Sequence, residues 1–193
     1  MDPEQIRRLR EVADELREVV EQLEGGWKVE ITEGQISVVM VDRTLPRGLN
    51  VRHLRRQVEA QTPDVIVLSD TDVEDPVTGL RKIPDLMVLA ADGIDLAARK
   101  VNSRDLLLVV EVVSGSNPNN DYREKLDDYP RMGIPTYLVV DPRKATLSVY
   151  GDPVRSPEGT RYATARTHAF GDAVHVDRWV FETAGLTRYP DSW

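Results

Sequence analysis

Residues 106–113, LLLVVEVV, decide the fold, because seven of these eight residues are apolar and four are valine. A short, nearly continuous run of this kind predicts a strand that is covered on both faces. Such strands occur in sheets that contain parallel pairs and carry other elements on both sides. We therefore expect an α/β fold in which a mixed β-sheet is flanked by helices.

Glu111 is the only charged residue in this run, and a period of two places it on the face of Val109 and Val113. Asp85 has a similar position in the expected strand 83–89, IPDLMVL. Burying an unpaired carboxylate costs several kcal/mol. Two such acids on neighbouring strands avoid this cost by binding a divalent cation, and their oxygens suit Mg²⁺. The alternatives are a Pro-Asp turn or strand start at Asp85 and a buried arginine partner for Glu111.

Lys125 is the third candidate residue, on a helix expected from about Asp121 to Met132. Tyr122 and Tyr129 lie three residues before it and four after it, so all three side chains share one helix face. The aromatic pair indicates that this face points inward. An inward lysine needs an acid, and it can hold a water molecule or offset charge on a phosphate. The alternative is a lysine whose head reaches solvent while its stem covers apolar surface.

The N-terminal segment predicts an amphipathic helix with Asp2 as its cap and Gly25-Gly26 after its end. Its apolar stripe consists of Ile6, Leu9, Val12, Leu16, Val19 and Leu23. We expect this helix to pack or to pair with a second copy, while its acids form a solvated face. We divide the chain into a helical extension, residues 1–26, and a single domain, residues 27–193.

The rest of the chain alternates strand signals with one further helix. Expected strands are 27–31, 35–41, 65–68, 136–140, 146–150 and 173–176, and the helix is 50–61 with Asn50 as its cap. The acidic residues 70–76 lack the spacing of a calcium loop, so a solvated loop is expected there.

Composition excludes several classes of function. The chain of 193 residues has no cysteine, which rules out disulfides and thiolate zinc sites and fits a cytoplasmic location. Its longest apolar run, residues 106–110, is too short for a membrane helix of about 20 residues. The net charge of −8 is the wrong sign for a protein that coats nucleic acid. A local basic segment, residues 47–56, nevertheless carries Arg47, Arg52, Arg55 and Arg56 without an acid. Arg52, Arg55 and Arg56 are candidates for contacts with nucleic-acid phosphates, and a solvated helix face is the alternative.

Five short motifs in series resemble one known family. They are Pro84-Asp85, EVVS at 111–114, DYREK at 121–125, residues 129–133, and YLVVDP at 137–142. In this order they are similar to the Uma family of predicted restriction endonucleases, within the PD-(D/E)XK nuclease superfamily. The resemblance covers residues 27–150 and implies a restriction-endonuclease-like fold.

The resemblance also implies roles for individual residues. Asp85 and Glu111 would be metal ligands, with the backbone carbonyl of Val112 assisting. The usual lysine of the superfamily would stand at position 113, where this chain has Val113, and Lys125 on the following helix would replace it. Glu30 resembles an upstream acid that completes the site.

Two classes of function follow from these residues. The first is a Mg²⁺-dependent endonuclease, with Mn²⁺ as a substitute, that hydrolyses DNA phosphodiesters as a homodimer, since duplex cleavage needs two active centres. The second is a catalytically inactive protein of the same fold that acts as a binding or regulatory module. A metal-dependent hydrolase of another phosphate ester is the third reading.

Overall fold

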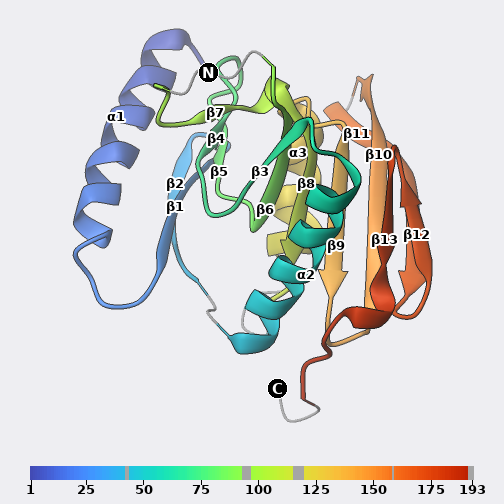
Figure 1. The fold of residues 1–193 in the computed structure, drawn as a ribbon. Coiled ribbons are helices and arrows are strands. Elements are labelled where there is room, and N and C mark those ends of the chain that lie inside the picture. The colour runs from blue at the N-terminus through green and yellow to red at the C-terminus, as the bar shows by residue number, and fades with distance from the viewer. Residues whose placement is uncertain (42–43, 93–96, 115–119, 158, 191–193) are drawn as a thin grey trace.

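The computed structural model describes residues 1–41, 44–92, 97–114, 120–157 and 159–190 (Figure 1). Its helices are α1 (Pro3–Val20), α2 (Leu45–Gln61) and α3 (Lys125–Arg131), the last preceded by a π-helical turn, Asn120–Glu124. Its strands are β1 (Trp27–Thr32), β2 (Gln35–Met40), β3 (Val65–Leu68), β4 (Val73–Glu74), β5 (Arg81–Lys82), β6 (Leu86–Ala90), β7 (Val101–Asn102), β8 (Leu106–Val112), β9 (Thr136–Asp141), β10 (Thr146–Ser156), β11 (Gly159–Ala169), β12 (Ala173–Val176) and β13 (Trp179–Glu182). Within the described ranges, no helix is long and apolar enough to cross a membrane.

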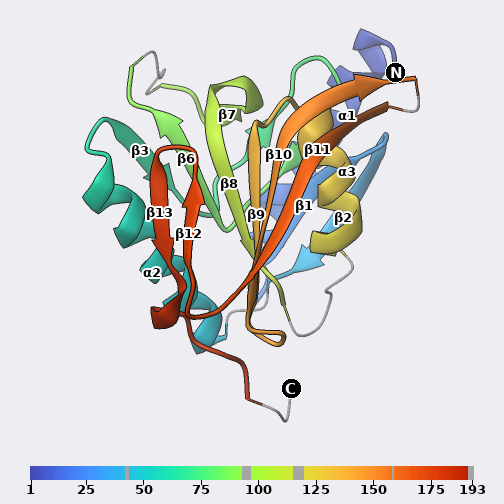
Figure 2. The same cartoon turned by 90° about the vertical axis from the view of Figure 1, so that its right-hand side faces the viewer.

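The central sheet has six strands in the order β11-β10-β9-β8-β6-β3, and β8 lies in its interior (Figure 2). Only the β8–β9 pair is parallel among these neighbours. Leu108, Val110 and Val112 of β8 face one apolar core, and Val109 with Val113 faces another. The expected mixed sheet with both faces covered is therefore confirmed, because alternate residues of one apolar strand serve two cores.

One face of this sheet is covered by α2 and by the β12–β13 hairpin. Leu54 and Val58 of α2 are fully buried there. Helix α2 begins at Leu45, so the expected start at residue 50 is wrong. Asn50 is a buried residue inside the helix, and its side chain exchanges two hydrogen bonds with the backbone of Thr187. That partner lies 137 residues away, so a local capping rule had no means of finding it.

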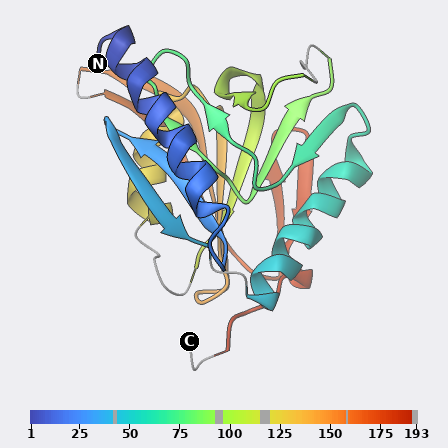
Figure 3. The same ribbon diagram turned by 90° about the vertical axis from the view of Figure 1, so that its left-hand side faces the viewer.

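The other face carries α3 and a smaller sheet with the order β2-β1-β5-β4-β7. Helix α1 crosses this smaller sheet on its outer side (Figure 3). Ala13 and Val20 of α1 pack with Val29 and Ile31 of β1. The expected helix and its capping residue Asp2 are confirmed.

The buried stripe of α1 is rotated relative to the expected one. Ile6, Ala13 and Val20 are buried, with Leu9 and Leu16 packed beside the same core. Val12, Val19 and Leu23 are exposed. The expected stripe omitted Val20 and included no small residue, whereas the small side chain of Ala13 is fully buried where the helix packs on the sheet.

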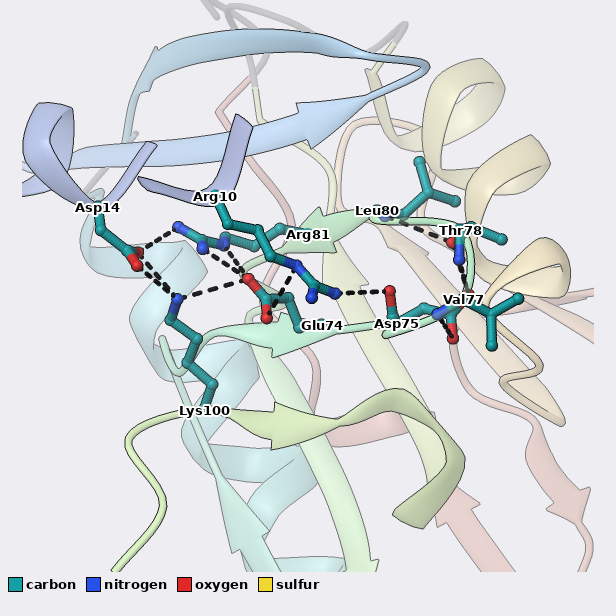
Figure 4. Close-up of polar contacts among 9 residues, drawn as sticks. All are labelled: Arg10, Asp14, Glu74, Asp75, Val77, Thr78, Leu80, Arg81 and Lys100. Atoms are coloured by element: carbon teal, nitrogen blue, oxygen red, sulfur yellow. Dashed lines mark hydrogen bonds and ion pairs between the residues drawn. The ribbon is translucent and has the colours of Figure 1, made fainter. Parts of the chain in front are cut away.

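A polar network fastens α1 to the smaller sheet (Figure 4). Arg81 is fully buried and contacts Asp14 of α1 at 2.7 Å and Glu74 of β4 at 2.5 Å. Lys100 contacts Asp14 at 2.8 Å, and Arg10 reaches the backbone oxygen of Asp75 at 3.1 Å. Asp14 is thus engaged with two cations and departs from the expected solvated acidic face of the helix.

The expected solvated loop at residues 70–76 is wrong in its larger part. Asp72 and Asp75 are buried, and residues 73–74 form β4. Asp72 is paired with Arg17 of α1, and Asp75 accepts hydrogen bonds from the turn around Thr78. Their charges are satisfied by partners distant in sequence or by a tight turn, which acidic composition alone does not reveal.

Candidate active site

Asp85 lies in the bend that precedes β6, which is the strand-start position named as its alternative. Its side chain is buried and is held by three donors. Lys28 contacts Oδ1 at 3.1 Å, Arg47 binds both oxygens, and the backbone N–H of Val112 donates to Oδ2 at 2.9 Å. Burial alone would raise the pKa of this carboxyl, but the charges of Lys28 and Arg47 outweigh it and lower the pKa well below its usual range.

Glu111 lies one residue before Val112 on β8 and is completely buried. Its Oε1 contacts the ammonium of Lys125 at 2.8 Å and accepts a hydrogen bond from the Tyr129 hydroxyl at 2.6 Å. Its Oε2 is buried without a hydrogen-bond partner among the described residues. Burial raises the pKa of Glu111 to about 7, because the opposing charge of Lys125 compensates only in part and the charge of Asp85 adds to the increase.

Lys125 begins α3 and points into the protein, with only 4% of its surface exposed. Besides Glu111 it contacts Asp121 at 3.2 Å. Burial would lower the pKa of this ammonium, but Glu111 and Asp121 raise it well above the ordinary value, so the lysine stays charged. The predicted inward orientation is confirmed and the solvent-reaching alternative is wrong. Tyr129 is buried as expected, whereas Tyr122 is only partly buried against the same core and donates to Asp141.

Glu30 belongs to β1 and is buried next to Lys125 and Lys82. It accepts a hydrogen bond from the backbone of Ile83 at 3.3 Å and lies 3.6 Å from the ammonium of Lys82. Burial would raise the pKa of Glu30, but the charges of Lys125 and Lys82 lower it. Glu30, Asp85, Glu111 and Lys125, which come from four separate segments, thus lie within one network of charges.

Sequence reasoning did not assign several residues of this network to the site, among them Lys28, Arg47, Lys82 and Asp121. Lys28 was not singled out, although it stands two residues before Glu30 and therefore shares its strand face. The alternation of these two charged residues with the apolar residues of the strand WKVEIT was the available signal. Arg47 was counted in the basic segment but was not assigned to the site. Because α2 starts earlier than expected, Arg47 lies in its first turn, where it reaches Asp85.

The three arginines expected to contact nucleic acid do not all lie on the same surface of α2. Arg52 and Arg55 line a cavity of about 600 Å³ that also reaches Arg47, Lys28 and Asp85. Arg56 is exposed on α2 and is not part of that lining. Arg55 additionally contacts Glu59 and the backbone of Val67. The cavity opens beside the carboxylate cluster, so it is the approach by which a ligand would meet Asp85.

The donor set fits a hard divalent cation at Glu111 better than at Asp85. Glu111 Oε2 is a buried oxygen without a hydrogen-bond partner in the described part of the chain, and carboxylate oxygens are the ligands that a hard cation prefers. Asp85, by contrast, was expected to lack a protein partner, and this is wrong, since Lys28 and Arg47 neutralise it. Among the described residues, no three His, Cys, Asp or Glu side chains form a ready metal cluster. A cation at Asp85 would have to displace these two basic side chains.

The mixed sheet carries a buried acid just before β6, a glutamate on β8 and a lysine at the start of α3, which is the arrangement expected of a nuclease-type α/β fold. The sequence matches the Uma2 family model, described as "putative restriction endonuclease", over residues 14–182, so the chain belongs to this family. Among solved structures, the fold is similar to that of "a putative nuclease belonging to DUF820" from Anabaena variabilis. That likeness has a TM-score of 0.65 at 12% identity and covers 89% of this chain and 96% of that chain. No protein with a curated function matches the sequence significantly. The family membership supports a nuclease function, and the structural likeness shows the fold.

Proposed function

We propose that this protein is a Mg²⁺-dependent endonuclease that hydrolyses phosphodiester bonds of DNA. The observation that carries the proposal is the buried convergence of Glu30, Asp85, Glu111 and Lys125, in which Glu111 keeps one oxygen without a hydrogen-bond partner among the described residues. Burying this many charges is costly, and proteins concentrate such perturbed groups at functional sites. The family membership adds an independent reason to read the cluster as a hydrolytic centre.

Glu111 and Asp85 would hold the cation, with the Val112 carbonyl beside them. When bound, Mg²⁺ supplies Lewis-acid polarisation of a phosphate oxygen and a lowered pKa of bound water. Tyr129 fixes the orientation of Glu111 by donating to Oε1. Lys125 is a permanent positive charge whose raised pKa makes it unsuited as a base. Its role is therefore to stabilise the negative charge that develops on the phosphate.

Lys28 and Arg47 are placed to exchange partners. Both bind Asp85 in the structure, and both also line the cavity by which a phosphate would approach. Guanidinium and ammonium groups bind phosphate and carboxylate with similar geometry. We propose that substrate phosphate draws these two side chains from Asp85, which leaves that carboxylate for the cation.

A catalytically inactive binding module is the second candidate, and one specific observation favours it. Asp85 receives hydrogen bonds from Lys28, Arg47 and the Val112 N–H on its two oxygens, which is a satisfied buried ion cluster. In that case the cluster would serve the fold alone. The homodimer, the DNA substrate and the cytoplasmic location are further parts of the proposal for the enzyme.

Nicking of supercoiled plasmid separates the two candidates. We expect wild type to nick plasmid in Mg²⁺ or Mn²⁺ but not in EDTA, and Lys125→Met to be at least about 100-fold slower, since it loses a charge-stabilising group. Glu18→Gln is the matched control, because Glu18 is an exposed acid on α1, away from the site. Intact plasmid with wild type in both metals, or equal rates for wild type and Lys125→Met, would favour the inactive module.

A further inference from the structure

We propose that the cavity between β1, α2 and the segment after β3 is a phosphate-binding site that works without a metal ion. It has a volume of about 600 Å³, within the range of small-molecule sites. Asp85 lies at its inner wall, and Arg52 on the exposed face of α2 also lines it. That the ligand is a phosphate of a nucleic acid rests on the proposed function.

The charges that line the cavity favour an anion. Among its described lining residues, five are cations (Arg17, Lys28, Arg47, Arg52 and Arg55) and two are acids (Asp70 and Asp85). The chain as a whole has a net charge of −8, so this is a local reversal of sign. Arg17 also pairs with the buried Asp72 and with Glu21, so its charge is largely compensated, whereas Arg55 pairs with Glu59, a half-exposed acid whose attraction is screened by water.

Two hydroxyl groups at the cavity are buried without a hydrogen-bond partner in the described ranges. They are Ser69 Oγ, just after β3, and Thr44 Oγ1, just before α2. Buried polar atoms are normally paired, so an unpaired set at one cavity indicates a missing partner. Rotation of these side chains toward the cavity would let each hydroxyl donate to a phosphate oxygen, and the surrounding cations would balance the phosphate charge.

The start of α2 adds a further argument. Thr44 is the N-cap residue, yet its side chain makes no capping hydrogen bond, and the first turn contains no acid. Helices ordinarily complement the positive end of their dipole with a cap or an acid. Here Thr44, Arg47 and Gly48 from this helix end line the cavity instead. A helix N-terminus, surplus cations and unpaired hydroxyls together match the chemistry of phosphate rather than that of a neutral ligand.

Calorimetric titration in EDTA tests this site apart from catalysis. The probes are inorganic phosphate and tetrathymidylate with and without a 5′-phosphate. The variants are Arg52→Gln and Ser69→Ala, and Arg56→Gln is the matched control because it removes the same charge from the same helix outside the cavity. We expect Arg52→Gln and Ser69→Ala each to weaken binding at least about fivefold, as expected for one hydrogen bond to a charged group, and Arg56→Gln to change it less than twofold.

The two sources of phosphate give different results. A large preference for the 5′-phosphorylated probe identifies a terminal phosphate, whereas equal binding of both oligonucleotides, weakened by Arg52→Gln, identifies an internal phosphodiester. Either result supports the site. No binding of any probe, or equal losses in Arg52→Gln and Arg56→Gln with Ser69→Ala unchanged, overturns it. Plasmid nicking is measured on the same proteins, so that the two proposals can fail separately. Phosphate binding can be absent while nicking persists, and nicking can be absent while phosphate still binds.

Discussion

Replacing Glu111 by glutamine should flatten the dependence of stability on pH. Glu111 is fully buried, and its pKa is raised to about 7 from an ordinary value of 4.5. A carboxyl with a raised pKa binds its proton more tightly in the folded state. Its contribution to stability is therefore present at low pH and is lost as the pH rises through the folded pKa. Glutamine keeps the shape of the side chain but has no proton to lose.

The size of the effect follows from the shift. Between pH 5 and pH 8, a group with these two pKa values lowers the free energy of unfolding by about 2 to 3 kcal/mol. Because Glu111 is close to Asp85, Asp121 and Lys125, the titration belongs to the cluster as a whole. Glu111→Gln should remove this decrease, so the stability of the variant relative to wild type should increase as the pH rises.

Urea denaturation in EDTA at pH 5 and pH 8 measures the difference directly. Glu18→Gln is the control, since the exposed Glu18 should leave the wild-type pH dependence unchanged. If the free energy of unfolding decreases equally for wild type and Glu111→Gln between the two pH values, the raised pKa described above for Glu111 is wrong. The same result would remove the electrostatic reason for a cation at Oε2.

Three further substitutions test the contacts of Asp85 and of helix α1. Asp85→Asn leaves Lys28 and Arg47 without a buried anion and should lower the free energy of urea unfolding by about 3 to 5 kcal/mol, whereas an unchanged midpoint would contradict their pairing. Arg81→Met should lower the free energy of unfolding by about 2 to 3 kcal/mol in the same assay, because it breaks the contact with Asp14. It should also speed tryptic cleavage within α1, and unchanged cleavage would contradict the role of Arg81 in holding this helix. Gly79→Ala should lower the thermal midpoint, since Gly79 has a φ of +78° and an added Cβ would lie 3.0 Å from Ile6 Cγ2. The cost should be about 1 to 3 kcal/mol and should exceed that of Gly133→Ala, which has the same φ but open space; equal costs would refute the contact.

Period-two and helical spacing predicted the parts of the fold that are set by local pattern. The apolar strand 106–113 appears as β8, and the two expected runs at 27–31 and 35–41 appear as the β1–β2 hairpin. The inward face of α3 followed from the spacing of Lys125 and Tyr129. In each case neighbouring residues carry enough information, because alternation or helical periodicity decides which side is buried.

Contacts between distant segments were not predictable in the same way. Lys28 and Arg47 bind Asp85 across 57 and 38 residues of sequence, and in the structure these two cations neutralise its carboxylate. Pattern reasoning identified Asp85 and Glu111 as buried acids but assigned their neutralisation to a metal ion, because it had no means of ranking distant cations. The metal-binding roles of Asp85, Glu111 and the Val112 carbonyl, and the division of the chain at residue 26, stay predictions.

An anomalous difference map from crystals grown with Mn²⁺ and a short DNA duplex tests the central claim most directly. We predict a peak within bonding distance of Glu111 Oε2, with Asp85 turned toward it and Lys28 and Arg47 turned toward the phosphate. An ordered site without a manganese peak, in which Lys28 and Arg47 still hold Asp85, would contradict the account.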